Sequence, residues 1–161
     1  MYKSLLFLSV IILFSFENLY SETLIINIES KYDEGYAMLG IYDKKDNFGK
    51  AKVNEKPNAD IVLMGAVVKI TNKKATAIID VPFGEYAIAG FQDLDGNGVL
   101  SGNFLGIPKE PVGFSGDAKV RFGPPKWNDA VFQFKKVNQE VLIYLDKICL
   151  LYTSPSPRDV S

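Results

Sequence analysis

Apolar and polar residues alternate with a period of two along several short segments of the chain. In the first of them, Leu24, Ile26 and Ile28 alternate with polar Asn27 and Glu29. The same alternation recurs at residues 37–41, 77–81 and 130–134, and further apolar runs lie at 61–70, 86–92 and 141–145. Because successive side chains of a strand point to opposite faces, this period predicts strands with one buried face.

Turn residues separate these segments, as at Gly35 and at 82–84, and no segment has a helical period. Parallel neighbours need long crossovers, usually helical, so pairing is expected to be mainly antiparallel. About seven short strands with turns between them are typical of a β-sandwich. The sequence therefore predicts one all-β domain with very little helix.

The first residues of the chain differ from this body. Lys3 precedes an apolar run at 5–16, polar Glu17 follows it, and small Ser21 is the expected cleavage position. This organisation is that of a secretory signal peptide. The run is shorter than the roughly 20 residues that span a bilayer as a helix. We therefore expect a signal peptide at 1–21 and an exported protein, periplasmic or extracellular.

The last residues also look foreign to the fold. Residues 149–159 resemble the translation of a transposon-type sequencing adapter, and a natural Ser/Pro-rich tail is the alternative. The domain is therefore expected at 22–148, followed by a non-native tail at 149–161. The only cysteine, Cys149, lies in this tail, so an internal disulfide is excluded.

Charge and composition exclude several classes of function. With 18 basic and 19 acidic residues, the formal net charge is −1, which gives no field for holding a polyanion. We expect no nucleic-acid partner and no stable membrane insertion after signal cleavage. The chain contains no histidine, which excludes a Ser-His-Asp triad, a histidine general base and a typical zinc site.

Two connections are too long for simple hairpins. Residues 44–60 are rich in Lys, Asn and Asp and are expected to form a solvated loop. Residues 101–117 alternate glycine and proline with apolar side chains, among them Phe104, Leu105 and Phe114. Since such side chains need burial, we expect this second connection to fold back as a compact cap on one end of the sandwich.

The sharpest local signal is the acidic run at 93–98. Asp93, Asp95 and Asn97 carry oxygen at alternate positions of a tight turn, a glycine follows, and Ser101 supplies a later oxygen. Side-chain oxygens at alternate positions, followed by a glycine at the turn, are typical of a calcium-binding loop.

The match to a calcium loop is partial. The twelfth position is Phe104, where an EF-hand has a bidentate glutamate, so the loop is not an EF-hand. Glu110 is the candidate to replace that ligand. A metal-free turn remains open as an alternative, since Asp95-Gly96 and Asn97-Gly98 are common turn dipeptides.

Three aromatic residues are candidates for a binding surface, namely Phe104, Phe114 and Trp127. Such side chains can line a groove for sugars or peptides, but most aromatic residues of a small sandwich fill its core. For Trp127 we favour packing at a strand entrance over a ligand role.

Several blocks of residues together resemble a known family. They are Tyr86 to Ala89, Gln92 to Gly98, Phe104 to Glu110, Gly113 to Ser115, and Gly123 to Pro125 with Asp129 and Ala130. In order and spacing, over about residues 24–134, they are similar to the bacterial family catalogued as domain of unknown function 2141. This resemblance implies an exported Ig-like or transthyretin-like (prealbumin-like) sandwich and no established activity.

The sequence departs from the family pattern at two positions. Gln92 stands where the family usually has histidine, and Ser101 where it usually has aspartate. Both changes remove groups that could bind metal or transfer a proton. They leave Asp93, Asp95 and Asn97 as the matching positions.

The expected function is that of a non-catalytic binding or structural module, which calcium stabilises if it binds at the acidic run. No other cofactor is expected, and the partner is an unidentified envelope or extracellular molecule. One alternative is a carboxylate-dependent hydrolase of carbohydrate or peptide that uses Asp93, Asp95 and Glu110. Another is a subunit that joins an envelope assembly through an exposed edge strand.

Overall fold

The computed structural model describes residues 20–118, 120 and 123–148 of the chain. Most of the expected signal peptide, residues 1–19, and the expected tail, residues 149–161, lie outside these residues. In the described part of the chain, no helix is long and apolar enough to cross a membrane.

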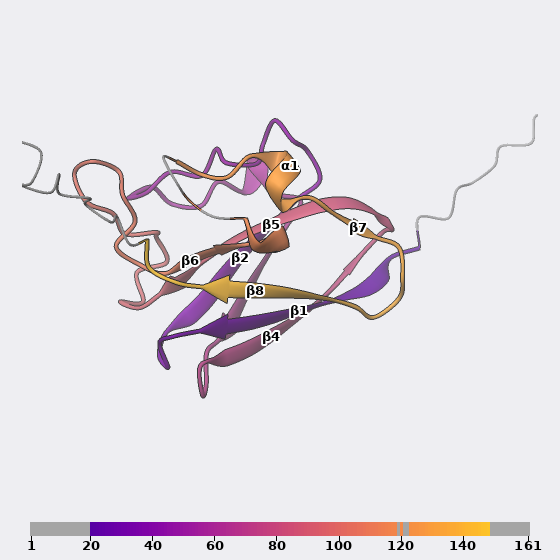
Figure 1. The fold of residues 1–161 in the computed structure, drawn as a ribbon, viewed down its shortest axis with the longest axis horizontal. Coiled ribbons are helices and arrows are strands. Elements are labelled where there is room, and N and C mark those ends of the chain that lie inside the picture. The colour runs from indigo at the N-terminus through magenta and orange to yellow at the C-terminus, as the bar shows by residue number, and fades with distance from the viewer. Residues whose placement is uncertain (1–19, 119, 121–122, 149–161) are drawn as a thin grey trace, which may run out of the picture.

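The described residues form a sandwich of two sheets (Figure 1). The strands are β1 (Glu22–Ser30), β2 (Tyr36–Tyr42), β3 (Met64–Lys69), β4 (Lys74–Val81), β5 (Gly84–Asp93), β6 (Val112–Phe114), β7 (Phe132–Phe134) and β8 (Gln139–Leu145). The helical elements are the 3-10 turns η1 (Ala59–Ile61) and η2 (Ser115–Asp117) and the single turn α1 (Trp127–Ala130). One sheet has the order β4-β1-β8 and the other β3-β2-β5-β6, with β7 also paired to β5. The predicted all-β sandwich with little helix is confirmed.

One strand pairing departs from the antiparallel pattern. β1 and β8 are parallel, with pairs that run from Leu24–Gln139 to Ser30–Leu145. Parallel neighbours need a long connection, and here nearly the whole domain lies between the two strands. Alternation within each strand carries no information about this direction, so the sequence did not reveal it.

A second departure concerns the strand that was expected at 130–134. Ala130 belongs to α1, and β7 begins only at Phe132. The amide of Val131 donates to the carbonyl of Trp127 at 2.8 Å and closes the helical turn. The buried hydroxyl of Ser115 donates to the carbonyl of Ala130, which fixes the turn against the sheet.

The main core lies between the two sheets and consists of the inward-facing side chains of the strands. Leu24, Ile26 and Ile28 are fully buried, as the alternation predicted. They pack with Ile41 of β2 and Ile88 of β5 in one cluster. Burial of each such side chain contributes about 1.5–3 kcal/mol, so this interior is the main source of stability.

The loop at 44–60, expected to be only solvated, also contributes to a second apolar cluster. Phe48 of this loop is 9% exposed. Its ring makes edge-on contacts with Tyr42, Phe114 and Trp127, at centroid distances of 5.5, 6.3 and 5.9 Å. Tyr42 belongs to this cluster and not to the main core, so the loop and α1 cover part of the outer face of the larger sheet.

The connection at 101–117 does not bury all of its apolar residues, and the expectation of a compact cap is wrong for its tip. Phe104 is 95% exposed and Leu105 is 66% exposed. Polar contacts hold the tip instead, since the side-chain oxygen of Asn103 accepts from the amides of Leu105 and Ile107 at 2.9 and 3.0 Å. With its backbone satisfied in this way, the tip does not need a buried anchor.

A buried glutamine links the end of β5 to the turn after β1. Gln92 is fully buried. Its side-chain oxygen accepts a hydrogen bond from the hydroxyl of Ser30, and its amide group donates to the carbonyls of Tyr32 and Glu34. Gln92 is therefore a structural bridge between the two sheets.

Replacement of this bridge is expected to destabilise the domain. In Gln92→Leu, one hydroxyl and two carbonyls lose their partner, and each unsatisfied buried group costs about 1–3 kcal/mol. We expect a loss of about 2–4 kcal/mol in the free energy of unfolding, measured by urea denaturation. The control Gln133→Leu, on the exposed side of β7, should change it by less than about 0.5 kcal/mol. Equal losses in the two variants would contradict the bridging role.

Candidate functional site

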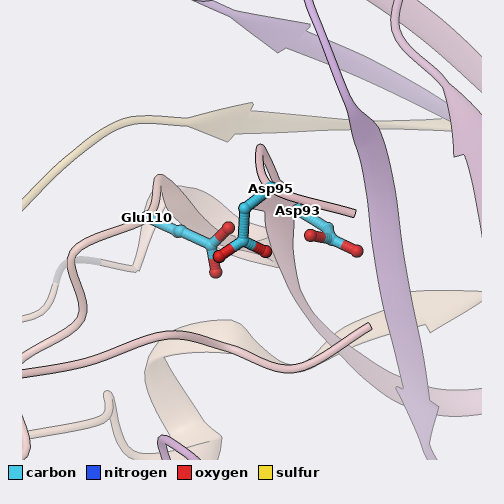
Figure 2. Close-up of side chains that lie close together, drawn as sticks. All are labelled: Asp93, Asp95 and Glu110. Carbon is cyan, nitrogen blue, oxygen red and sulfur yellow. The ribbon is translucent and has the colours of Figure 1, made fainter. Parts of the chain in front are cut away.

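The acidic loop, residues 93–101, begins at the last residue of β5, and Glu110 lies two residues before β6. Figure 2 shows the side chains of Asp93, Asp95 and Glu110 gathered around the turn that follows β5. Asp93 and Glu110 are each 4% exposed, whereas Asp95 is exposed. The site thus combines two buried carboxylates with one at the surface.

Asp93 organises the first half of the loop. One of its oxygens accepts hydrogen bonds from the amides of Gly96 and Asn97 at 2.8 and 3.2 Å, and the other accepts from the amide of Gly98 at 2.8 Å. Gly96 and Gly98 have φ angles of 74° and 72°, a conformation that glycine adopts readily. The two glycines thus let three successive amides converge on one carboxylate.

Glu110 holds the two ends of the loop together. Its oxygens accept hydrogen bonds from the amide of Leu94 and from the amide of Ser101, both at 2.9 Å. The chain next to Glu110 is fixed to β5, because the amide of Gln92 donates to the carbonyl of Pro111 at 2.9 Å. Pairing of β6 with β5 therefore delivers Glu110 to the loop.

The exposed rim of the loop is also hydrogen-bonded. Asp95 accepts from the side-chain amide of Asn97 at 2.9 Å and from the hydroxyl of Ser101 at 3.4 Å. The side-chain amide of Asn97 also donates to the hydroxyl of Ser101, at 3.1 Å. The structure thus places four of the five candidate ligands in the acidic loop and the fifth, Glu110, in contact with it. That these residues bind a metal stays a prediction.

The spacing of the carboxylates fits a calcium ion. Asp93, Asp95 and Glu110 each offer one oxygen, and these three atoms lie within 4.8 Å of one another. Calcium–oxygen distances are about 2.3–2.6 Å, so two ligands on opposite sides of the ion are separated by about 5 Å. The remaining coordination positions would fall to Ser101, carbonyl groups or water.

Lysine and arginine side chains do not neutralise this cluster within the described ranges. The ion pairs found there join Lys31 to Asp146, Lys52 to Glu55, and Lys74 to Glu29. Two buried carboxylates and a third close by therefore have only hydrogen-bond donors as partners.

A shallow pocket of about 300 Å³ adjoins the acidic loop. Tyr36 and Met38 of β2 and Val67 of β3 line it together with the loop. Sequence reasoning missed these three residues as site candidates. A signal was present, because Tyr36 and Met38 alternate with buried Ala37 and had to face outwards.

The three candidate aromatic residues do not share one surface. Phe114 and Trp127 both contact Phe48 in the second apolar cluster. Phe104 stands apart at an exposed loop tip.

Comparison with known proteins identifies the family. The model of a family described as "Uncharacterized protein conserved in bacteria (DUF2141)" matches residues 25–141. This range contains the acidic loop, Glu110 and all but the ends of the sandwich. No curated protein and no solved structure matches the chain. Because the matched range covers well over half of its length, the chain belongs to this uncharacterised bacterial family.

Proposed function

We propose that this chain is an exported, non-catalytic binding or structural module whose acidic loop is held by buried carboxylates and stabilised by calcium. The observation that carries the proposal is that five backbone amides donate to Asp93 and Glu110. A catalytic acid must carry a proton, and a nucleophile must direct a free oxygen at its substrate. Carboxylates whose oxygens all accept amides are fixed as anchors of the loop. Asp93 Oδ2 and both oxygens of Glu110 accept only one amide each, so each keeps a second lone pair that a cation could use.

Electrostatic repulsion supports the calcium part of the proposal. Carboxylate oxygens within 4.8 Å of one another repel each other by about 3 kcal/mol or more per pair at an effective dielectric constant of about 20. The five amide hydrogen bonds, at about 1.5–3 kcal/mol each, offset a similar total. A divalent cation between the three carboxylates would replace their mutual repulsion by attraction to the ion.

The start of β1 supports export. β1 begins at Glu22, directly after the expected cleavage position at Ser21. Removal of residues 1–21 would therefore leave every described strand complete. We expect the intact mass of the protein recovered from the periplasm or the medium to correspond to a chain that starts near Glu22. A full-length mass, or protein found only in the cytoplasm, would contradict export.

Calcium is expected to raise the melting temperature. A ligand that binds only the folded state adds RT ln(1 + [L]/Kd), or about 2.7 kcal/mol at a hundredfold excess over Kd. For a domain of this size the shift is on the order of 10 °C. Thermal melts in calcium and in chelator measure it, and coincident melts would exclude a calcium-stabilised loop.

Asp95→Asn provides the matched test of this site. Asp95 is exposed and its hydrogen bonds lie at the rim of the loop, where water can replace a lost acceptor, so the fold is retained while one charged ligand is lost. We expect the calcium-induced shift to shrink by more than half. Asp46→Asn removes an exposed carboxylate from another loop and should leave the shift unchanged.

Asp93→Asn separates the module from the hydrolase alternative. An asparagine offers one acceptor oxygen where Asp93 uses both, so the bond to Gly98 or those to Gly96 and Asn97 are lost. We expect a loss of about 1–3 kcal/mol in the free energy of unfolding. An unchanged melting temperature with loss of hydrolysis of a carbohydrate or peptide substrate would favour the hydrolase.

A further inference from the structure

Asn97 and Gly98 form the one Asn-Gly dipeptide of the sequence, and they lie in the acidic loop. In such a dipeptide the backbone nitrogen of the glycine can attack the side-chain carbonyl carbon of the asparagine, because glycine has no Cβ to crowd the approach. Asparagine is counted among the thermolabile residues of proteins. Asn97 is also exposed, so water reaches it. The dipeptide is therefore a candidate for deamidation.

Deamidation at this position needs water as its only co-reactant. The nitrogen of Gly98 forms a bond to Cγ of Asn97, the Cγ–Nδ2 bond breaks, and ammonia leaves with the proton of the Gly98 amide. Water then opens the cyclic imide at one of its two carbonyl groups. The product at position 97 is either aspartate or isoaspartate, and in isoaspartate the chain continues through Cγ.

The closed loop restrains the side chain of Asn97 with three hydrogen bonds. Its Oδ1 accepts from the amide of Val99 at 2.7 Å. Its Nδ2 donates to Asp95 at 2.9 Å and to Ser101 at 3.1 Å. Ring closure requires that Cγ face the nitrogen of Gly98 in a reactive geometry. The three bonds oppose the side-chain rotation that this geometry requires and hold the leaving nitrogen in place.

The attacking nitrogen is restrained as well. The amide of Gly98 donates to Oδ2 of Asp93 at 2.8 Å. The nitrogen becomes a nucleophile only when it loses this proton, and a carboxylate is far too weak a base to remove it. The negative charge of Asp93 also repels hydroxide, which could remove the proton. The bonds that anchor the loop thus hold both partners of the reaction.

We propose that Asn97 is a deamidation site whose rate the acidic loop controls by staying closed. The reaction takes place from the open loop, so its rate follows the fraction of molecules in which the loop is open. This control depends on hydrogen bonds within the chain and not on calcium. It therefore goes beyond the calcium-stabilised module and stands if calcium does not bind.

Both products weaken the metal-free loop. Aspartate at position 97 cannot donate to Asp95 or to Ser101, and it adds a negative charge beside the other carboxylates. Isoaspartate adds a methylene group to the backbone before Gly98, which displaces the amide that donates to Asp93. Each product favours further opening of the loop, and the modification accumulates with the time that the loop has spent open.

Peptide mass spectrometry of the purified protein, incubated in chelator, measures deamidation at Asn97 over time. We expect the folded protein to react on the order of a hundredfold more slowly than the same chain unfolded in urea at the same pH and temperature. Asp93→Asn should raise the rate on the order of tenfold, because hydrogen bonds to a charged group are lost. Ser101→Ala removes one acceptor of Nδ2 at the rim of the loop and should raise the rate to a smaller extent.

Two controls separate opening of the loop from unfolding of the domain. Ile79→Val removes a methyl group from the core at the end of β1 that is remote from the loop. It lowers the free energy of unfolding but should leave the rate at Asn97 unchanged. Asn138, in a turn at the same remote end, is measured in every sample and should not follow Asn97.

Three results would each overturn the proposal. The first is deamidation at Asn97 in the folded wild-type protein as fast as in the unfolded chain. The second is a rate in Asp93→Asn and in Ser101→Ala no higher than in Ile79→Val. The third is a rise at Asn138 in step with Asn97, which would mean that the whole domain has to unfold.

Discussion

Five backbone amides of the acidic loop donate hydrogen bonds to two buried carboxylates, Asp93 and Glu110. The rest of the site follows from this constraint. A buried charge without hydrogen-bond partners is costly. Opening the loop would remove the amides that donate to both carboxylates, so the buried charges keep the loop closed. The loop therefore holds Asp95 and Ser101 at its rim, within reach of the same centre, and forms one wall of the adjoining pocket.

Asp93 and Glu110 lie next to two contacts that join the sheets of the sandwich. β5 ends at Asp93, and the residue before it, Gln92, crosses to Ser30 at the end of β1. β6 pairs with β5, and its first residue, Val112, also bridges to Asp146 just after β8, with hydrogen bonds of 2.9 and 3.1 Å. Glu110 stands immediately before this junction. Strand pairing from both sheets therefore sets the geometry of the site, which is an argument for a rigid module.

Local patterns predicted the parts of this structure that depend on neighbouring residues. The alternation at 24–28 placed the inward face of β1 correctly, and Glu110, which was named as a candidate beside the acidic run, contacts the amides of Leu94 and Ser101 in that loop. The missed features depend on contacts between distant segments. The parallel pairing of β1 with β8 and the burial of Phe48 arise from such contacts. Phe104 and Leu105 were expected to be buried in a compact cap, but hydrogen bonds to the side chain of Asn103 hold the loop tip without burial of these two residues.

The anchoring of the loop is tested most directly by amide hydrogen exchange measured by NMR. The relevant amides are those of Leu94, Gly96, Asn97, Gly98 and Ser101. If the two carboxylates hold them, these amides exchange orders of magnitude more slowly than that of Glu55 in an exposed loop, although they lie outside the strands. Exchange at the rate of Glu55 would contradict the account.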